Sequence, residues 1–502
     1  MDHKPREGGT RLFPLVERAA NRWPNDVAIV RGPHSFTFRQ LQSAAEKVAG
    51  QLLRLGIGSG FKVGLLCPNG PEYVIASFAL FAVNAVSVPV FRGLKEPEIA
   101  TLSAELGLEA YCYSPQLEHQ LPTESFQHAA DVALEAESGL LLRLARSLPS
   151  DSDGSDRHRL AELGAALIRF TSGTTSNAKG VILTQSGLLE RTRPFAEAYS
   201  VRTGDCILDL LSMSHVFCQV TAGLAHGATL AVEDSQRIDA IARVIRQQPV
   251  THIEATPGFY TLLLSTEDVR AEDLNRTRHL ISCGAPLPER IAAAFRSRLG
   301  REIGQLYGLT ETGPALINTN EGPSKRGSLG VAAPGCEIRL KSDAGSVSDE
   351  LGELQVRCPG LFHGYCAPWA ARETVLDDGW FCTGDVARKD ADGYYWIVGR
   401  TKAMINVGAV KVFPDELERL LLAHPRVKEA FVYAAPDARF GEVPCAQIVL
   451  YPGPAITSRE LARDVNRDLD VFKTLRKIDI VTAIPKTPAG KIKRAQDAGT
   501  GA

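Results

Sequence analysis

The chain has 502 residues, which is more than one ordinary hydrophobic core holds, so at least two domains are expected. Hydrophobic residues make up 44% of the sequence and charged residues 23%, as is typical of a soluble globular protein. The net charge of −2, without a basic stripe, argues against a nucleic-acid partner.

The N-terminal part of the chain alternates between helix-like and strand-like patterns. Its first residues, MDHKPREGGTRLF, carry charges with no apolar segment after them, so no signal peptide is expected. Helical spacing at 38–57, 100–109 and 238–248 is followed each time by a strand-like run, at 62–68, 110–114 and 250–256. This order predicts an α/β fold with largely parallel sheets.

The apolar stretch 73–91 is the one candidate for a membrane span. Asn84 and Pro89 interrupt it, so the pattern favours a buried helix followed by a strand, with no transmembrane segment. The polar and acidic stretch 147–159 predicts an exposed loop.

A second change in composition follows residue 400. A helix at 413–424, strands at 427–435 and 445–451, and a helix at 458–469 predict a compact α+β unit of about a hundred residues. The expected division is a large domain, 1–400, and a small domain, 401–502.

The ten cysteines are scattered and include no C-x-x-C pair, which argues against a zinc ribbon and against a disulfide framework. We expect buried free thiols in a reducing cytoplasm, and cytoplasmic is the predicted location.

The run FTSGTTSNAKG, residues 170–180, has no side chains that could build a core. Strand-like runs flank it, and a helix is expected near Ser186, a good N-cap. Gly173 and Gly180 permit unusual backbone angles, and Lys179 adds a positive charge to hydroxyl and backbone donors, which suits polyphosphate oxygens. A solvent-exposed Ser/Thr-rich turn is the alternative. A Walker loop does not fit, because Lys179 precedes the last glycine and a strand follows.

FTSGTTSNAKGV resembles the phosphate loop of the adenylate-forming superfamily, which comprises acyl-CoA synthetases, non-ribosomal peptide adenylation domains and firefly luciferases. Ser176 and Ala178 stand where that family more commonly has Gly and Pro. Four further segments resemble the family in its order: ISCGAPLP (281–288), QLYGLTETGP (305–314), GWFCTGDVARKDADGYYWIVGR (379–400) and PKTPAGKIKR (485–494). The resemblance implies a large multi-sheet N-terminal domain and a small, mobile α+β C-terminal domain.

The resemblance also implies a reaction in two steps. A carboxylate attacks the α-phosphate of ATP to give acyl-AMP and pyrophosphate, and a pantetheine thiol then accepts the acyl group. The implied ATP contacts are Thr171, Ser172, Gly173, Thr174, Thr175, Lys179, Gly284, Ala285, Pro286, Tyr307, Gly308, Thr310, Asp385, Arg400 and Lys491.

Particular roles follow from the same resemblance. Glu311 would hold Mg²⁺, and Thr310 would contact the α-phosphate. Tyr307 would lie against the adenine face, with core packing as its alternative. Asp385 would bind both ribose hydroxyls and Arg400 would assist there, with a surface salt bridge between the two as the alternative.

Lys491 matches the catalytic lysine, which touches the attacking carboxylate and the α-phosphate; a frayed basic tail is the alternative. Lys402 occupies the hinge position about which the small domain rotates between the two steps. His215 is either the gate beside the substrate carboxylate or a satisfied core histidine. The acyl group would lie near Gly284, Gly308, Pro314 and Ala315. Ser212 and Ser214 stand where amino-acid-activating members usually carry an Asp, which favours an uncharged or aromatic acid.

The thiol side carries one departure from the family. Gly408 is followed by Ala409, where a second glycine usually lines the pantetheine tunnel, and Lys411 could meet a phosphate of the acceptor. The prediction is an acyl-CoA synthetase that uses ATP, Mg²⁺ and CoA on a small carboxylic acid. Alternatives are a stand-alone adenylation enzyme that loads an acyl carrier protein, a catalytically dead nucleotide-binding protein and, without specific support, a luciferase.

Overall fold

A computed structural model describes residues 11–134, 139–147, 155–170, 179–215, 217–235, 237–319, 325–342, 345–366, 368–408, 410–467 and 469–486. Several residues singled out from the sequence lie outside these ranges: Thr171, Ser172, Gly173, Thr174, Thr175, Ala409 and Lys491.

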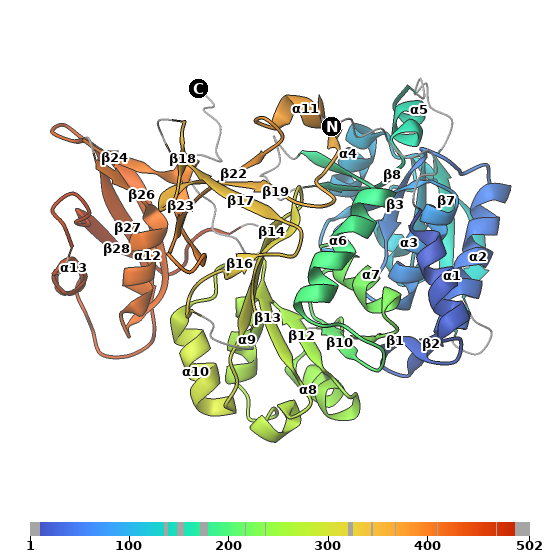
Figure 1. Cartoon of the computed structure of the whole chain (residues 1–502), viewed down its shortest axis with the longest axis horizontal. Helices are drawn as coiled ribbons and strands as arrows, with labels where there is room; N and C mark the ends of the chain where they lie inside the picture. The colour runs from blue at the N-terminus through green and yellow to red at the C-terminus, as the bar shows by residue number, and fades with distance from the viewer. Residues whose placement is uncertain are drawn as a thin grey trace.

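Two nine-stranded sheets form the body of the N-terminal part (Figure 1). In spatial order, the first consists of β16 (Val331–Ala332), β15 (Gly313–Asn318), β14 (Gly304–Leu309), β13 (His279–Cys283), β12 (His252–Ala255), β10 (Cys206–Asp209), β11 (Thr229–Val232), β1 (Val27–Arg31) and β2 (His34–Thr37). The second consists of β21 (Trp369–Ala371), β20 (Gly364–Cys366), β9 (Gly180–Thr184), β8 (Ala165–Phe170), β4 (Val86–Pro89), β3 (Lys62–Leu66), β5 (Ala110–Tyr113), β7 (Leu141–Ser147) and β6 (Phe126–Ala133). The centre of each sheet is parallel and its margins are antiparallel, so the predicted α/β class is confirmed.

The largest apolar cluster contains residues of both sheets and of five helices, which places those helices between the sheets. They are α1 (Phe13–Arg22), α2 (Phe38–Arg54), α3 (Pro71–Ala82), α6 (Gln185–Ala198) and α7 (Phe217–Ala225). A second cluster joins the first sheet to α8 (Ile238–Gln247), α9 (Pro257–Leu264) and α10 (Glu289–Leu299). A third joins the second sheet to α4 (Glu96–Leu106) and α5 (Ser155–Glu162).

The stretch 73–91 is a buried helix followed by a strand, α3 and β4, as predicted. No helix in the described part of the chain is long and apolar enough to cross a membrane.

Two local predictions are wrong. Helix α5 begins at Ser155, inside the stretch expected to be a loop. Helix α6 begins at Gln185, near Ser186 as predicted, but its N-cap is Thr184 and not Ser186. The Thr184 hydroxyl accepts a hydrogen bond from the Gly187 N–H.

A five-stranded antiparallel sheet lies between the two large sheets and the C-terminal unit (Figure 1). Its strands are β18 (Val347–Ser348), β17 (Glu337–Lys341), β19 (Leu351–Arg357), β22 (Phe381–Lys389) and β23 (Tyr395–Arg400), and the short α11 (Arg372–Val375) precedes β22.

The C-terminal unit has its own apolar cluster and is α+β, as expected. It begins after a single 3₁₀ turn, Thr401–Ala403, which contains the exposed Lys402. Its elements are β24 (Ile405–Val407), β25 (Val410–Val412), α12 (Pro414–Ala423), β26 (Val427–Asp437), β27 (Gly441–Leu450), α13 (Ser458–Asn466) and β28 (Lys477–Ile480).

The cysteines depart from the expectation in one respect. Eight are free and six of these are buried, but Cys336 and Cys358 form a disulfide. The prediction of free thiols throughout is wrong here, because antiparallel pairing of Glu337 with Arg357 brings two cysteines 22 positions apart in sequence face to face.

Candidate nucleotide- and acyl-binding site

A buried carboxylate lies where the five-stranded sheet meets the edge of the first large sheet. Asp385 on β22 and Arg400 on β23 are cross-strand partners, and Arg400 Nε donates to Asp385 Oδ1 at 2.9 Å. The Tyr307 hydroxyl on β14 donates to the other carboxylate oxygen at 2.6 Å. The Asp385 side chain is 5% exposed, whereas that of Arg400 is 62% exposed. Asp385, predicted to bind the ribose, therefore meets Tyr307, predicted to lie against the adenine face, although the two residues are 78 positions apart.

Asp385 and Arg400 form the ion pair that the salt-bridge alternative predicted. It is not a surface pair, because the Asp385 carboxylate is buried and also accepts a hydrogen bond from Tyr307. Burial, and then the neighbouring Asp385 charge, raises the pKa of Tyr307 well above its usual value. Tyr307 therefore remains a hydrogen-bond donor at neutral pH and holds one oxygen of the carboxylate in place.

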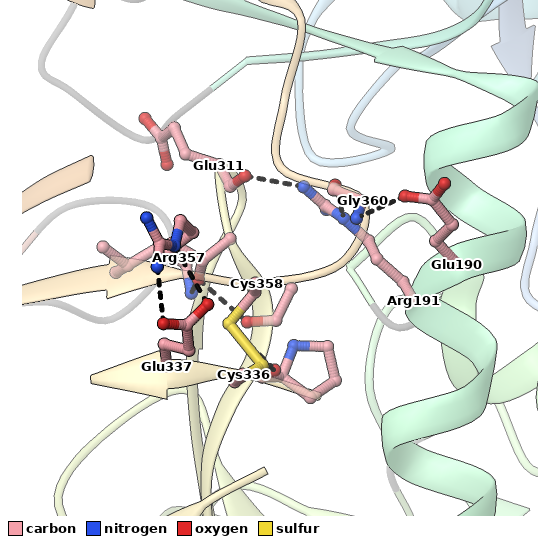
Figure 2. The surroundings of a disulfide bond; sticks show 12 residues. Glu190, Arg191, Glu311, Cys336, Glu337, Arg357, Cys358 and Gly360 are labelled. Atoms are coloured by element: carbon pink, nitrogen blue, oxygen red, sulfur yellow. Dashed lines mark hydrogen bonds and ion pairs between the residues drawn. A yellow bond between two sulfur atoms is a disulfide. The ribbon is translucent and has the colours of Figure 1, made fainter. Parts of the chain in front are cut away.

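The loop that carries Thr310 and Glu311 is held by a buried arginine that the motifs do not contain (Figure 2). Arg191, on α6, donates to the carbonyl oxygens of Thr310 at 2.8 Å, Glu311 at 2.7 Å and Gly360 at 2.7 Å. The Gly360 N–H in turn donates to Glu190 Oε2 at 2.8 Å. Burial lowers the pKa of Arg191 to about 10, so its guanidinium is charged at neutral pH.

Sequence reasoning missed Arg191, although one signal was present. On α6, Leu188, Arg191 and Phe195 recur at helical spacing and all three are buried, so Arg191 lies on the apolar face of the helix. A charged residue in such a position requires several hydrogen-bond partners, and the backbone of the Thr310–Glu311 loop supplies them.

Glu311 is joined to the end of the hydroxyl-rich loop by a tyrosine. The Tyr365 hydroxyl, on β20, donates to Glu311 Oε1 at 3.0 Å, and Lys179 Nζ lies 4.7 Å from the centroid of the Tyr365 ring. Strand β20 pairs with β9, which begins at Gly180, directly after Lys179. The predicted strands on either side of the hydroxyl-rich loop are confirmed, and they pair with each other antiparallel, with Phe170 opposite Gly180.

Gly284 and Gly308, the two glycines predicted to contact both ATP and the acyl group, differ in how much space surrounds them. Gly284 follows β13 with a φ of +79°, and a Cβ there would meet no atom within 4 Å, so the space beside it is open. Ala285 and Pro286 continue this exposed loop. At Gly308, a Cβ would lie 2.2 Å from the Gly313 carbonyl oxygen, so the β14–β15 hairpin itself requires glycine.

The chain matches the family model described as AMP-binding enzyme over residues 16–366, and the model of the C-terminal domain of that family over residues 416–491. This protein is a member of the AMP-binding enzyme family.

Relatives of this AMP-binding enzyme align over nearly its whole length. An indoleacetate–CoA ligase of Aromatoleum aromaticum is 29% identical over 96% of this chain and 96% of its own. A feruloyl-CoA synthase of an Amycolatopsis species is 29% identical over 98% of this chain and 99% of its own. The solved structure of the Bacillus subtilis O-succinylbenzoate coenzyme A synthetase in complex with AMP superimposes with a TM-score of 0.79 at 24% identity, covering 96% and 97% of the two chains. That superposition confirms the adenylate-forming enzyme fold.

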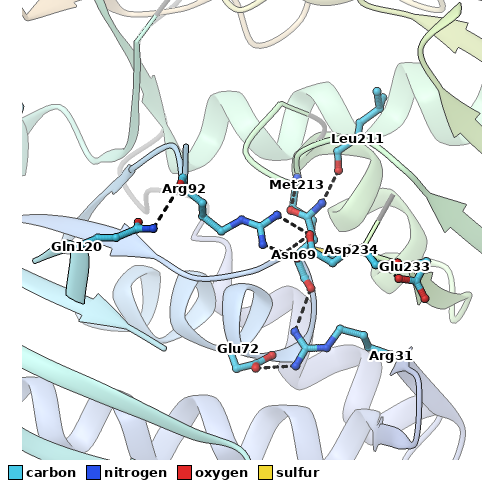
Figure 3. A network of polar contacts seen from close by, with 10 residues as sticks. Arg31, Asn69, Glu72, Arg92, Gln120, Leu211, Met213, Glu233 and Asp234 are labelled. Carbon is cyan, nitrogen blue, oxygen red and sulfur yellow. Dashed lines mark hydrogen bonds and ion pairs between the residues drawn. The ribbon is translucent and has the colours of Figure 1, made fainter. Parts of the chain in front are cut away.

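In this AMP-binding enzyme, His215 is exposed, so it is not a core histidine. It ends the turn 212–215, and a polar network fixes the segment before it (Figure 3). Asn69 Nδ2 donates to the Leu211 carbonyl at 2.6 Å, and Asn69 Oδ1 accepts from the Met213 N–H at 3.1 Å. Asp234, which accepts from the Asn69 N–H and from Arg92, anchors this loop in turn.

The residues predicted to contact the acyl group differ in burial. Pro314 and Ala315 are buried at the start of β15, and Ala315 packs in an apolar cluster with Leu340 and Tyr395. The described geometry thus gives Ala315 a packing role, while Gly284 borders open space.

The thiol-side residues of the AMP-binding enzyme lie in the C-terminal unit. Gly408 has a φ of +62°, and a Cβ there would meet only the Phe440 ring at 3.9 Å. A crevice of about 1250 Å³ separates the five-stranded sheet from the C-terminal unit; its lining includes Arg388, Lys389, Trp396, Lys411, Phe413 and Lys473, together with several acidic residues. Because both signs of charge line this crevice, its charge does not discriminate between CoA and a carrier protein.

Glu311 is one carboxylate, and the described residues contain no group of three His, Cys, Asp or Glu side chains that could hold a metal. A single carboxylate fits Mg²⁺ that arrives with a nucleotide, because phosphate and water oxygens supply its other ligands.

Proposed function

We propose that this protein is an AMP-forming acyl-CoA ligase that joins an uncharged, aromatic carboxylic acid to CoA. The observation that carries the proposal is the meeting of three motif residues, Tyr307, Asp385 and Arg400, around one buried carboxylate. The relatives named indoleacetate–CoA ligase, feruloyl-CoA synthase and 4-coumarate–CoA ligase support an aromatic acid. Ser212 and Ser214, which hydrogen bond to each other at 2.8 Å, offer no charged partner for an α-ammonium group.

The proposed ATP site uses each part of the described geometry. The Asp385 carboxylate, oriented by Tyr307, would accept hydrogen bonds from both ribose hydroxyls. The open space beside Gly284 would admit the adenine ring. Lys179 would attract the phosphates, and Glu311 would hold Mg²⁺, whose charge supports departure of pyrophosphate. Thr310 would donate to the α-phosphate from a loop that Arg191 holds in place.

The acid would bind with its carboxylate near His215 and attack the α-phosphate. Two anions must approach each other in this step, so cations and oriented donors account for much of the acceleration. We assign Lys491 the role of bridging the two anions. Rotation of residues 401–502 about Lys402 would then withdraw Lys491 and admit the thiol, which attacks the acyl carbonyl as AMP leaves.

The acceptor is tested most directly by product analysis. The protein would receive ATP, Mg²⁺ and a panel of aromatic and aliphatic acids, with CoA, with a pantetheinylated carrier protein, or with neither. We expect acyl-CoA from an aromatic acid in the CoA arm. Acyl-AMP that accumulates with CoA but transfers to the carrier would replace CoA with a carrier protein, and the absence of any adenylate would refute a ligase function.

Ala409→Gly refines the same experiment. Removing a methyl group from the proposed pantetheine tunnel should raise the rate of thiol transfer and leave acyl-AMP formation unchanged. A loss of acyl-AMP formation in this variant would show that residue 409 serves the adenylation step instead.

A further inference from the structure

Cys336 and Cys358 lie beside Pro314, close to the Thr310–Glu311 loop that we assign to the nucleotide. They flank the paired residues Glu337 and Arg357 at the end of β17 and β19, and their Cα atoms are 4.2 Å apart. Strand pairing, rather than the disulfide, therefore keeps the two sulfur atoms together. The ion pair between Arg357 and Glu337, with a distance of 3.0 Å from Nε to Oε1, reinforces this register (Figure 2).

The cysteine pair is connected to the Thr310–Glu311 loop in two ways, through Pro314 and through Gly360. Cys336 Sγ lies 3.3 Å and Cys358 Sγ lies 3.9 Å from the carbonyl oxygen of Pro314, which ends the segment QLYGLTETGP. Two residues beyond Cys358 is Gly360, whose carbonyl accepts from Arg191. The pair is thus linked to both ends of the Thr310–Glu311 loop.

Gly360 has no room to move without displacing its neighbours. A Cβ at this position would lie 2.1 Å from the Gly187 carbonyl oxygen and 2.9 Å from Arg191 Cγ, so the backbone of residue 360 packs tightly on α6. A shift of residues 358–360 would therefore move the arginine that holds the carbonyls of Thr310 and Glu311.

We propose that Cys336 and Cys358 are a reversible thiol–disulfide site that sets the affinity of the protein for ATP. In the disulfide form, β17 is tied covalently to the 358–360 segment and the Arg191 contacts are intact. In the dithiol form, the sulfurs separate to van der Waals distance, and each S–H can donate to the Pro314 carbonyl, which a disulfide cannot do. Both changes displace residues 314 and 358–360 and weaken the arrangement of the Thr310–Glu311 loop.

The chemistry requires only a low-molecular-weight disulfide as the oxidant. Cys336 is partly exposed and Cys358 is buried, so the Cys336 thiol loses its proton and attacks the external disulfide, which releases one small thiol. The Cys358 thiol then loses its proton and attacks Cys336 Sγ in the mixed disulfide, which releases the second small thiol. Two protein thiols are oxidised, one external disulfide is reduced to two thiols, and a dithiol reverses the reaction.

The test uses the full chain in mixtures of reduced and oxidised dithiothreitol. Free thiols are trapped with a maleimide and located by peptide mass spectrometry, and ATP binding is measured by calorimetry in the same mixtures. Cys336 and Cys358 should be labelled together under reducing conditions and protected together under oxidising ones. The dissociation constant for ATP should rise about 3- to 10-fold on reduction.

Cys336→Ser and Cys358→Ser should each bind ATP as the reduced wild-type chain does, whatever the mixture. Cys382→Ser, which removes another partly exposed cysteine, should keep the full response. A pair that never becomes protected, or an ATP affinity that is the same in both states, overturns the proposal. The ATP measurement rests on the proposed nucleotide site, but thiol trapping does not; a chain that forms the disulfide without binding ATP would refute the ligase function instead.

Discussion

Arg191 offers the sharpest test of how the site is held. Its guanidinium donates to three backbone carbonyls that belong to Thr310, Glu311 and Gly360. Arg191→Lys keeps the positive charge, but a lysine side chain has a single nitrogen. It can therefore replace only part of the set of three hydrogen bonds that the guanidinium donates. The contacts from Arg191 to Thr310 and Glu311 are to their backbone carbonyls and not to the side chains that we assign to ATP and Mg²⁺, so we expect any loss of activity to come from displacement of the loop.

The expected loss can be worked from these contacts. A hydrogen bond from a charged donor contributes about 1.5–3 kcal/mol, so losing two of three costs about 3–6 kcal/mol. Part of this cost appears as lower stability, and the rest as a displaced Thr310–Glu311 loop. A misplacement of about 1 Å in an active site typically lowers the rate by about 100-fold. We therefore expect kcat/KM for ATP to fall by about 100-fold.

The assay is acid-dependent exchange of pyrophosphate into ATP, which reports the adenylation step alone, combined with thermal unfolding. Arg193→Lys is the matched control, because Arg193 lies on the same helix, is exposed, and pairs only with Glu197 at 2.6 Å among the contacts described. The control should keep its exchange rate within about twofold. If Arg191→Lys also exchanges at the wild-type rate while folded, the loop does not depend on this arginine and the reasoning is refuted.

Two further predictions address other parts of the site, and a third addresses Asp209, a buried carboxyl at the end of β10. Tyr307→Phe removes a hydrogen bond to the Asp385 carboxylate, so KM for ATP in the exchange assay should rise about 10-fold; an unchanged KM would show that Tyr307 does not orient Asp385 for the nucleotide. Lys491→Ala should abolish acyl-AMP formation but spare thioester formation from supplied acyl-AMP, and equal loss of both steps would contradict the division of roles. Burial raises the pKa of Asp209 from 3.8 to about 7, so the folded chain keeps a proton that the unfolded chain releases, and this group lowers stability as the pH rises through that window. Asp209→Asn should therefore gain about 3 kcal/mol over the wild type between pH 5 and pH 7.5 in urea unfolding, whereas parallel pH profiles would contradict the buried carboxyl.

The sequence singled out the residues that we propose to touch ligands, but it did not reveal the residues that hold them in place. Asp385, Arg400 and Tyr307 could be singled out because they lie in runs that resemble motifs of the family, and their side chains do meet. The strands β8 and β9 could be predicted because the runs on either side of the hydroxyl-rich loop alternate, but their antiparallel pairing could not. Helix and strand order was readable for the same reason, since a buried face imposes a period of two or of 3.6 residues.

What could not be predicted depends on contacts between distant parts of the chain. Tyr365 contacts Glu311 because β20 pairs with β9 near the edge of the second sheet. No local sequence pattern predicts that pairing. The disulfide depends in the same way on the register of β17 with β19. The start of α5 was missed because its helix is short and polar, so neither periodicity nor composition distinguished it from a loop.

Arg191 is a residue outside the motifs on which we expect the proposed activity to depend. It lies on α6, which follows the hydroxyl-rich loop in the chain, and it holds the loop that carries Glu311, so it couples the two segments proposed to grip the phosphates. Gly360 joins the cysteine pair to the same arginine. Because Arg191 contacts backbone carbonyls, its substitution leaves the sequence of every motif unchanged, and we expect it to slow the reaction by displacing the loop. A member of this family that retains all five motif segments but lacks a donor at this position of α6 is therefore expected to bind ATP in a loosened site and to form acyl-AMP slowly.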